Sequence, residues 1–250
     1  MSTPARRIVI VGATSSIAEH CARLWAERAP SEIVLVVRDA GRAEPIAADL
    51  RVRGATAVRV VAGGFDTPAA IAETVGRACE DRVPDLVLVA HGNLPDQERC
   101  QADLAVCADA LEVNGVSPAL FAEAFAQRLF ARGSGTLVVI GSVAGDRGRR
   151  SNYAYGAAKG LVTRYVQGLQ HRAAGTAVRV VLVKPGPTAT PMTRHLADRG
   201  AKLASVESVA ACIVAGADAG RPTVYAPAKW ALIMMVIRHL PRIVFDRMNV

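Results

Sequence analysis

Short runs of β-branched residues alternate with longer alanine-rich segments along this chain, and that alternation constrains the fold more than any other feature. The runs are RIVIVGA, EIVLVV, AVRVVA, DLVLVA, GTLVVIG, AVRVVLVKPG and TVYAP, and the segments between them include residues 17–28, 67–81, 102–132 and 155–174. The runs are apolar without strict alternation, which is typical of strands covered on both faces. Alternating strands and helices predict parallel strands joined by right-handed crossovers.

The length and composition fit one domain of this kind. The chain has 250 residues, of which 51% are hydrophobic, so it can bury a large core. No linker, repeat or low-complexity segment divides it. We therefore expect a single domain over residues 1–250, with a Rossmann-type α/β fold: a doubly wound parallel sheet of about seven strands with helices on both faces. Residues 228–247 are expected to form an apolar and basic C-terminal helix.

Charge and cysteine content narrow the classes of partner. The net charge is +8, but the excess is arginine spread along the chain and aromatic residues make up only 4%, so no nucleic-acid binding is expected. The five cysteines are dispersed without a CxxC pair, which favours reduced thiols and no metal site. No signal peptide is recognisable, and no run approaches the roughly 20 apolar residues of a spanning helix. These features predict a cytoplasmic protein.

The turn after the first run has the pattern of a nucleotide-binding loop. In VGATSSIAEH, Gly12 is expected to make the tight turn, and the amides that follow it then point toward a pyrophosphate at a helix N-terminus. Ser16 and Ala18 replace the second and third glycines of the usual pattern, so an ordinary turn with a serine N-cap is an equal alternative. The candidate cofactor-binding residues here are Gly12, Thr14, Ser15, Ser16 and Ile17.

The end of the second run bears on the choice of cofactor. An acidic residue there would accept hydrogen bonds from both ribose hydroxyls of NAD, but the chain has Val37 followed by Arg38. A guanidinium matches the dianionic 2′-phosphate of NADP. The acidic side chain of Asp39 beside Arg38 argues against this interpretation, and an arginine that is only solvated is the alternative. The sequence favours NADP(H), with NAD(H) as the alternative.

The stretch SNYAYGAAKG contains two tyrosines and one lysine, and helix geometry decides which tyrosine faces the lysine. Tyr155 and Lys159 are four residues apart and share a helix face, whereas Tyr153 points elsewhere. Ser142 follows the fifth run, at a strand end where its hydroxyl can reach the same cleft. The ammonium is expected to lower the pKa of the phenol from about 10, so that the phenol can exchange a proton near neutral pH.

Asn114 and the spacing of the other three residues support a catalytic interpretation. Asn114 is a polar residue amid apolar neighbours in LEVNGVSP, and we expect it to hold a water chain that leads from the lysine to solvent. A surface helix pair is the alternative for Tyr155 and Lys159 alone, because this spacing is common by chance. Serine, tyrosine and lysine at offsets of 13 and 4, on a strand end and a helix, occur together much more rarely.

These motifs resemble those of the short-chain dehydrogenase/reductase family over essentially the whole chain. GATSSIA is similar to the glycine motif of the family, PGPTAT is similar to its PG motif, and Asn114, Ser142, Tyr155 and Lys159 are similar to its catalytic tetrad. The resemblance implies a nicotinamide cofactor and a carbonyl or alcohol substrate. It also implies that Tyr155 and Lys159 lie at the cofactor, with Lys159 bonded to the nicotinamide ribose.

The resemblance also assigns residues beside the nicotinamide. Pro185 and Gly186 are implied to flank the ring, and Thr190 to contact its carboxamide or the phosphates, with Thr188 in the same site. VAHG stands where the family usually has NNAG. Ala90 and Gly92 are therefore expected at the cofactor, and they leave His91 in an unusual place nearby. We interpret His91 as a spacer, because Tyr155 already fills the role of the acid.

Two blocks, GDRGRRSNYAYGAAK and APAKWALIMMVIRHLPRIVF, resemble decaprenylphosphoryl-2-keto-ribose reductases more narrowly. These enzymes reduce a 2-keto sugar linked to a polyprenyl phosphate, so the resemblance implies a lipid-linked sugar substrate. Arg147, Arg149 and Arg150 are candidates to clamp the substrate phosphodiester, with solvated loop charge as the alternative. The apolar run at residues 230–237, flanked by basic residues, is expected either to pack in a subunit interface or to meet a membrane surface.

Together these features predict an NAD(P)H-dependent ketoreductase in which Tyr155 donates the proton and Ser142 positions the substrate oxygen. The substrate is either the 2-keto group of a polyprenyl-phosphate-linked pentose, or a 3-oxoacyl thioester or other small carbonyl compound. A dinucleotide-binding redox sensor is the non-enzymatic alternative. We expect a homodimer or homotetramer in the cytoplasm, at the inner face of the membrane if the substrate is lipid-linked.

Overall fold

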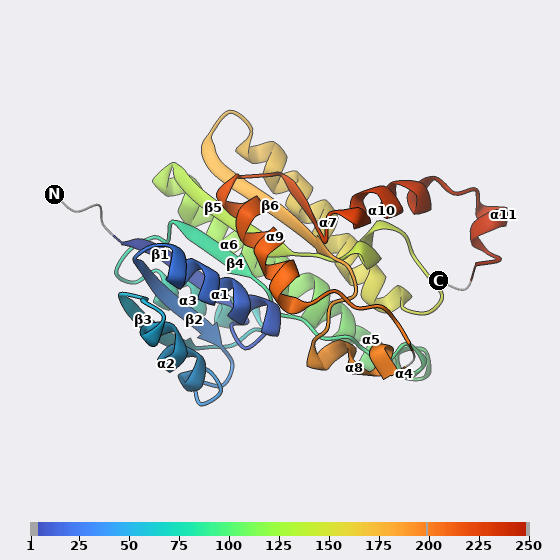
Figure 1. Ribbon diagram of the computed structural model, residues 1–250, viewed down its shortest axis with the longest axis horizontal. Coiled ribbons are helices and arrows are strands. Elements are labelled where there is room, and N and C mark those ends of the chain that lie inside the picture. The colour runs from blue at the N-terminus through green and yellow to red at the C-terminus, as the bar shows by residue number, and fades with distance from the viewer. Residues whose placement is uncertain (1–4, 199, 249–250) are drawn as a thin grey trace.

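The computed structural model describes residues 5–198 and 200–248, which form a parallel sheet in the order β3-β2-β1-β4-β5-β6-β7 (Figure 1). The strands are β1 Arg6–Val11, β2 Ser31–Val37, β3 Ala57–Ala62, β4 Leu86–Val89, β5 Ser134–Ile140, β6 Ala177–Pro185 and β7 Thr223–Ala226. Every pair of neighbours is parallel. The predicted Rossmann-type fold class is confirmed, and each predicted run matches one strand to within one residue at its start.

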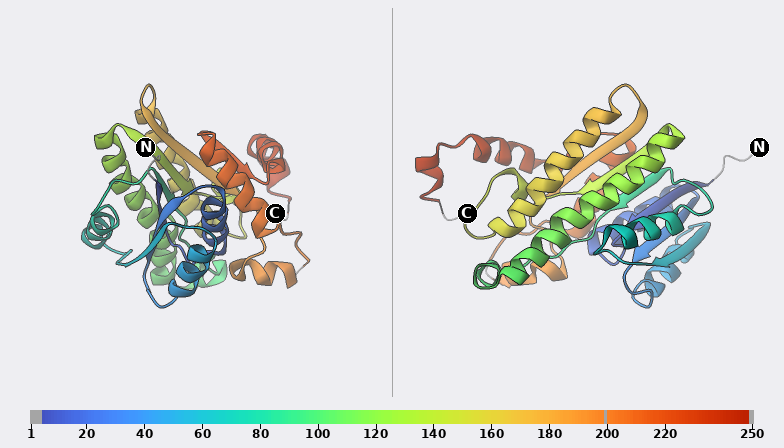
Figure 2. Two further views of the ribbon diagram at one scale, coloured as in Figure 1. Left: turned by 60° about the vertical axis from the view of Figure 1, so that its left-hand side comes forward. Right: turned by 180° about the vertical axis from the view of Figure 1, so that it is seen from behind.

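Helices cover both faces of the sheet and enclose two hydrophobic cores (Figures 1 and 2). The helices α1 Ser16–Arg28, α2 Glu44–Val52 and α9 Val206–Asp218 lie on one face, and α3 Pro68–Ala78, α6 Ser117–Arg132 and α7 Tyr153–Ala173 lie on the other. In β1, Ile8 and Ile10 pack into the first core and Val9 and Val11 into the second. Burial on both faces explains why the strand sequences are continuously apolar.

Short elements gather beyond the carboxyl ends of the strands (Figure 1). They are α4 Gln97–Ala102, α5 Leu104–Leu111, the π-helical turn η1 Glu112–Val116, the 3₁₀ turns η2 Val143–Asp146 and η3 Pro191–Thr193, and α8 Arg194–Asp198. The helix expected over residues 102–132 begins at Leu104 and runs to Arg132, with η1 as a π-helical turn inside it. Asp103 is extended between α4 and α5 and caps α5 by accepting a hydrogen bond from the Ala105 amide at 2.8 Å.

The C-terminal segment forms two helices, α10 Lys229–His239 and α11 Arg242–Phe245, which we call the C-terminal arm. The expected single helix at residues 228–247 breaks before Pro241, because a proline ring disfavours a helical conformation in the preceding residue. Leu240 is accordingly extended, with φ −60° and ψ 132°. The arm reaches away from the sheet (Figure 1), and in α10 only Met234 is buried.

One helical stretch, Leu104–Arg132, is long and apolar enough to cross a membrane by length and composition, although the sequence has no run of 20 apolar residues. Alanine raises its mean hydropathy between the charged side chains. Phe121, Phe125 and Leu129 of this stretch are fully buried in the second core. The stretch therefore has the packing of a core helix, and core helices also pass this test.

Candidate active site

A cavity of about 890 Å³ opens beyond the carboxyl ends of the strands, where doubly wound sheets bind their ligands. Every residue that the sequence assigns to catalysis or to cofactor binding lines this cavity. They come from the β1–α1 turn (Gly12, Thr14, Ser15, Ser16, Ile17), the end of β2 (Arg38), the loop after β4 (Ala90, Gly92), η1 (Asn114), the end of β5 (Ser142), α7 (Tyr155, Lys159) and the end of β6 (Pro185, Gly186, Thr188, Thr190).

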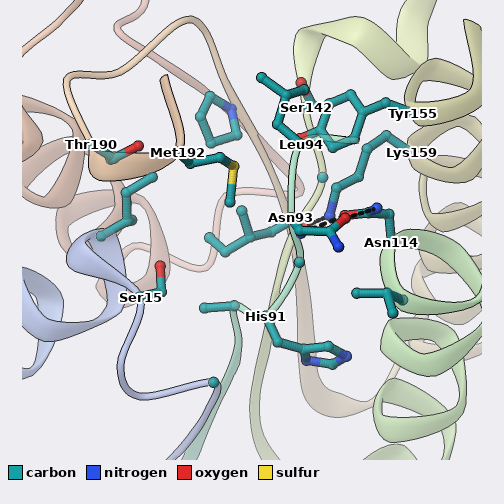
Figure 3. Close-up of a pocket in the computed structure, with 18 of the residues that line it drawn as sticks. Ser15, His91, Asn93, Leu94, Asn114, Ser142, Tyr155, Lys159, Thr190 and Met192 are labelled. Carbon is teal, nitrogen blue, oxygen red and sulfur yellow. Dashed lines mark hydrogen bonds between the residues drawn. The ribbon is translucent and has the colours of Figure 1, made fainter. Parts of the chain in front are cut away.

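Ser142, Tyr155 and Lys159 converge on one side of the cavity (Figure 3). The Ser142 hydroxyl accepts a hydrogen bond from the Ala144 amide at 3.1 Å and faces the cavity beside Tyr155. The Lys159 ammonium lies 5.9 Å from the centroid of the Tyr155 ring and donates to the carbonyl oxygen of Ile140 at 3.1 Å. Tyr153 is 46% exposed and does not line the cavity, as the helix-face argument predicts.

The electrostatics of Tyr155 differ from the sequence-based expectation. Burial raises the pKa of the phenol, and the neighbouring Ser142 hydroxyl acts in the opposite direction. The net direction is therefore opposite to the lowering that the sequence predicts. Burial also lowers the pKa of Lys159 to about 8, so this side chain remains mostly protonated at neutral pH.

Two glycines allow the elements around Lys159 to approach closely. An added Cβ at Gly145, in η2, would come within 2.6 Å of the Lys159 carbonyl group, so the turn after Ser142 rests directly on α7. An added Cβ at Gly115, in η1, would come within 3.2 Å of the Cα of Ala158. The close packing of η2 and η1 against α7 brings Ser142 and Asn114 toward Lys159 from two sides.

Asn114 is fully buried and its side chain binds the loop that follows β4 (Figure 3). Its Nδ2 donates to Asn93 Oδ1 at 2.7 Å and to the Ala110 carbonyl oxygen at 2.9 Å, and its Oδ1 accepts from the Asn93 amide at 2.9 Å. One lone pair of Oδ1 is left for the expected water. The sequence reasoning missed Asn93, whose only signal was its position directly after VAHG.

His91 points away from Ser142 and Tyr155 and packs among aromatic rings (Figure 3). Its ring lies 5.0 Å from the Phe65 ring and 5.3 Å from the Phe121 ring, between centroids. The Ser117 hydroxyl donates to the Phe65 carbonyl oxygen at 2.6 Å, so His91 Nε2 must donate to Ser117 at 2.9 Å. Burial lowers the pKa of His91 to about 3. A neutral, fixed imidazole fits the interpretation of His91 as a spacer.

The nucleotide end of the cavity offers donors and cations for an anionic ligand. Ser15 is the N-cap of α1 but makes no side-chain cap, and in the described residues the amides of Thr14, Ser16 and Ile17 make no hydrogen bond. Unpaired amides at a helix N-terminus fit a pyrophosphate. The exposed side chains of Arg38 and Arg42 line the same end. The sequence reasoning missed Arg42, although it follows Arg38 in the same segment, VRDAGR.

Of the three arginines proposed to clamp a phosphodiester, only Arg149 lines the cavity. Arg147 donates to the carbonyl oxygens of Ile237 at 2.6 Å and Leu240 at 2.8 Å, and its guanidinium stacks 3.7 Å from the Phe245 ring. It therefore caps the C-terminal end of α10 and holds the C-terminal arm. The expectation of a three-arginine clamp is corrected to a single arginine at the cavity, since Arg150 also lies outside its wall.

The C-terminal arm and the Ser142 loop share one wall of the cavity. Trp230 of α10 lines the cavity and packs on Gly186, where an added Cβ would come within 1.9 Å of the indole Nε1. Asp146, in η2, forms a buried ion pair with Lys184 of β6 and accepts a hydrogen bond from the Tyr225 hydroxyl at 2.8 Å. The sequence reasoning missed both the place of Trp230 in the cavity wall and the ion pair by which Asp146, outside that wall, holds the loop.

Comparisons with known proteins agree with this geometry. A family model described as short chain dehydrogenase matches residues 6–201. The chain is 34% identical over 254 residues to an uncharacterised oxidoreductase of Streptomyces coelicolor, covering 100% of this chain and 98% of the relative. It is 33% identical over 249 residues to an uncharacterised oxidoreductase of Mycobacterium tuberculosis, covering 98% of each.

Solved structures show the same fold. A short-chain dehydrogenase from Sphingobium yanoikuyae in complex with NADPH superposes with a TM-score of 0.83 at 24% identity, covering 98% of this chain and 96% of that one. A short-chain dehydrogenase from Burkholderia cenocepacia in complex with NADP has a TM-score of 0.82 at 19% identity, covering 100% of both chains.

Proposed function

The chain belongs to the short-chain dehydrogenase family of oxidoreductases, and on this premise we propose that it is an NADP(H)-dependent ketoreductase. The observation that carries the proposal is the meeting of Ser142, Tyr155 and Lys159 at one cavity that also receives the N-terminus of α1. A redox sensor that only binds dinucleotide would need the nucleotide end of this cavity. It would have no use for a buried tyrosine, lysine and serine at the other end.

The reaction divides into hydride transfer and proton transfer. A bound nicotinamide cofactor would supply the hydride to the substrate carbonyl carbon. Tyr155 would donate the proton to the carbonyl oxygen, and the Ser142 hydroxyl would donate a hydrogen bond to the same oxygen. Lys159, with a pKa of about 8, is mostly protonated at neutral pH and, by family resemblance, would bond the nicotinamide ribose. Asn114 would act by holding the loop at Asn93.

Several features support NADP(H) as the cofactor, with NAD(H) as the alternative. The free amides of the first turn of α1 suit the pyrophosphate, and Arg38, joined by Arg42, suits the 2′-phosphate. Asp39 accepts a hydrogen bond from the Gly41 amide at 2.9 Å, inside the loop that carries Arg38 and Arg42. By family resemblance, residues 185–190 would lie beside the nicotinamide.

Replacing each tyrosine in turn tests the proposed acid. We expect Tyr155→Phe to lower kcat for a small ketone about 10³-fold, within the range of a lost general acid, while the Kd of NADPH stays within about twofold. Tyr153→Phe is the matched control and should keep nearly all activity, because Tyr153 is exposed outside the cavity. Steady-state kinetics and fluorescence titration measure both quantities. Equal losses in the two variants would refute the assignment.

For the substrate, we propose the 2-keto group of a polyprenyl-phosphate-linked pentose, with the C-terminal arm at the inner face of the membrane. The arm exposes Leu232 (64%), Met235 (53%) and Ile243 (71%). It also carries Lys229, Arg238, Arg242 and Arg247 against a single acid, Asp246. Apolar and basic side chains together suit an anionic lipid surface. A 3-oxoacyl thioester or other small carbonyl compound is the alternative substrate, and a subunit contact in a homodimer or homotetramer is the alternative role of the arm.

Vesicle binding separates these alternatives. The protein should co-sediment with anionic phospholipid vesicles at low salt and bind less, though still measurably, at about 0.5 M salt, because apolar contact persists when charge is screened. The double variant Leu232→Asp/Ile243→Asp should stay in the supernatant with its ketone activity retained. If the wild-type protein does not bind vesicles, and the double variant dissociates into smaller species on size-exclusion chromatography, the arm lies between subunits instead. The ketoreductase proposal would survive that result.

A further inference from the structure

Buried polar atoms without partners cluster at one turn beside the reacting groups. In the part of the chain that the structure describes, seven buried side-chain nitrogen and oxygen atoms lack a hydrogen-bond partner, and four of them belong to Gln97, Arg149 and Asn152. Arg149 and Asn152 line the cavity together with Ser142 and Tyr155. Native proteins satisfy nearly all buried polar groups, so such a concentration beside a cavity calls for an explanation.

The side chain of Arg149 presents an unused pair of donors. Its Nε and Nη2 are the two unpartnered nitrogens, and they form one edge of the guanidinium. The nearby carboxylate of Asp146 is already occupied by Lys184 and Tyr225. Burial lowers the pKa of Arg149, and the charge of Asp146 acts in the opposite direction. The Nε–Nη2 edge has the spacing that binds a carboxylate or phosphate through two parallel hydrogen bonds.

Asn152 is the N-cap of α7 but does not cap the helix. An asparagine in this position ordinarily accepts a hydrogen bond from an amide of the first helical turn. Here the Gln97 side-chain oxygen accepts from the Ala154 amide at 3.0 Å and takes over that role. The Oδ1 of Asn152 is left buried without a donor. The backbone N–H of Asn152 donates to the backbone carbonyl oxygen of Arg149 at 3.2 Å, so one turn of the chain carries both side chains.

We propose that Arg149 and Asn152 form a substrate subsite for a ketone that carries both an anionic group and a hydroxyl. The Arg149 edge would bind the phosphate or carboxylate, and Asn152 Oδ1, which can only accept, would bind a hydroxyl next to the carbonyl. This inference rests on the proposed ketoreductase function and is independent of a lipid chain. Its chemistry is shared by a soluble phosphorylated hydroxyketone and by a lipid-linked phosphodiester.

Paired ketones test the anionic half of the subsite. With NADPH saturating, so that the cofactor's own anion sites are filled, kcat/KM for dihydroxyacetone phosphate should exceed that for dihydroxyacetone at least tenfold. Arg149→Met should raise the KM for the phosphate about 10- to 100-fold, the range for lost charged hydrogen bonds, and so reduce the preference. Arg149→Lys should fall between, because it keeps the charge but loses the fork. Arg164→Met, which removes an exposed α7 charge outside the cavity, should keep the preference.

A second pair of ketones tests the hydroxyl half. Asn152→Ala should raise the KM for dihydroxyacetone severalfold more than the KM for butanone, which has no hydroxyl to donate. The melting temperature should change by no more than about 2 °C, because the side chain caps nothing. An equal rise for both ketones, or a large loss of thermal stability, would mean that Asn152 is structural, and that half of the subsite would be wrong.

Binding without turnover makes the inference independent of the reaction. Calorimetric titration of dihydroxyacetone phosphate into the protein saturated with NADP⁺ should detect binding that Arg149→Met weakens. A geranylphosphoryl 2-keto pentose competing more strongly than the soluble phosphate would identify the lipid-linked source, and the reverse order would identify the soluble one. If neither probe prefers wild type over Arg149→Met while Tyr155→Phe still abolishes ketone reduction, the subsite is refuted and the ketoreductase stands. If Tyr155→Phe leaves ketone reduction intact, the ketoreductase proposal itself fails.

Discussion

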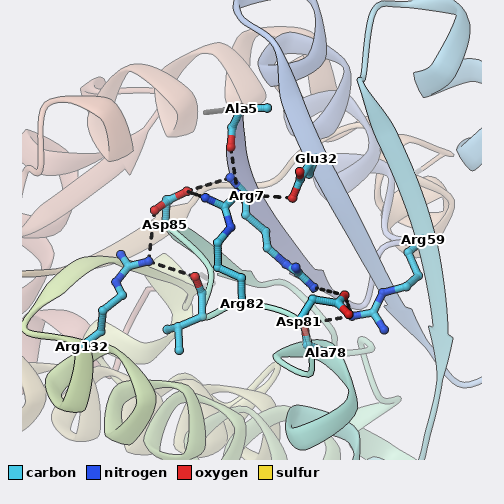
Figure 4. A network of polar contacts seen from close by, with 10 residues as sticks. Ala5, Arg7, Glu32, Arg59, Ala78, Asp81, Arg82, Asp85 and Arg132 are labelled. Carbon is cyan, nitrogen blue, oxygen red and sulfur yellow. Dashed lines mark hydrogen bonds and ion pairs between the residues drawn. The ribbon is translucent and has the colours of Figure 1, made fainter. Parts of the chain in front are cut away.

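Charged side chains have different roles at the two ends of the parallel strands, which we call the amino edge and the carboxyl edge of the sheet. At the amino edge, Asp85 accepts from the Arg7 amide at 2.8 Å and from Arg132 at 3.1 Å, and pairs with Arg82 at 3.6 Å (Figure 4). Asp81 pairs with the Arg7 guanidinium at 3.1 Å. Only the Nε of Arg7 is left without a partner among the buried side-chain atoms of this network. The arginines of this edge fasten strands and helices to one another.

At the carboxyl edge, the cations at the cavity are mostly unpaired. Arg38, Arg42 and Arg149 line the cavity, and within the described residues none of them forms an ion pair with a carboxylate. The exception is the buried pair of Lys184 and Asp146, which fixes the loop after Ser142. The contrast indicates that one edge uses charge for folding and the other keeps charge for ligands. Unsatisfied polarity, more than charge itself, marks the functional edge of this sheet.

The largest effect that we predict is a loss of stability when the charge network at the amino edge is disrupted. Asp85→Ala leaves the buried Arg7 backbone amide without its acceptor and also removes contacts with Arg82 and Arg132, so we expect unfolding to become easier by about 2–3 kcal/mol. That corresponds to a melting temperature lower by roughly 4–12 °C for a chain of this size. Thermal unfolding followed by circular dichroism measures the change.

The matched control for this prediction is a surface ion pair. Asp218, whose side chain is as exposed as that of Asp85, contacts only the side chains of Arg6 at 2.9 Å and Arg28 at 3.4 Å, and Asp218→Ala should therefore cost at most about 1 kcal/mol. Below the transition, the Kd of NADPH should be the same in Asp85→Ala as in the wild type. A variant with unchanged stability and weakened cofactor binding would contradict the division of labour between the two edges.

The fold could be read from the sequence because burial on both faces demands continuous apolar runs. RIVIV becomes β1 since Ile8 and Ile10 enter one core while Val9 and Val11 enter the other. Helix periodicity was likewise enough to bring Tyr155, and not Tyr153, to the cavity. In both cases a short stretch of chain contains the whole physical reason for the result.

The remaining features depend on contacts between distant segments, which periodicity does not encode. Arg147 is bound to carbonyl oxygens about 90 residues away, so its sequence position near Ser142 gave the wrong role. The pKa of Tyr155 is raised by burial, and Lys159 donates to the Ile140 carbonyl oxygen, a partner that no spacing rule predicts. Asn152 is left free only because Gln97 caps α7 from another helix.

A smaller effect is expected at the carboxyl edge, and it would be seen in ligand binding while stability is unchanged. Arg38 has no ion-pair partner among the described residues, so Arg38→Ala should shift the melting temperature by no more than about 2 °C. The wild type should bind NADPH more tightly than NADH, and the variant should lose about tenfold of that preference, or about 1.4 kcal/mol, because a dianionic 2′-phosphate loses one guanidinium. The affinity for NADH should hardly change.

Fluorescence titration of both cofactors measures this preference, with Arg164→Ala as an exposed control outside the cavity. Any preference for NADPH over NADH that remains in Arg38→Ala would be assigned to Arg42, and the double variant Arg38→Ala/Arg42→Ala should remove it. Equal affinities of the wild-type protein for NADPH and NADH would leave Arg38 as a solvated side chain. The unpaired charge of the carboxyl edge would then be explained by Arg149 and the substrate alone, and the contrast between the two edges would no longer extend to the nucleotide end of the cavity.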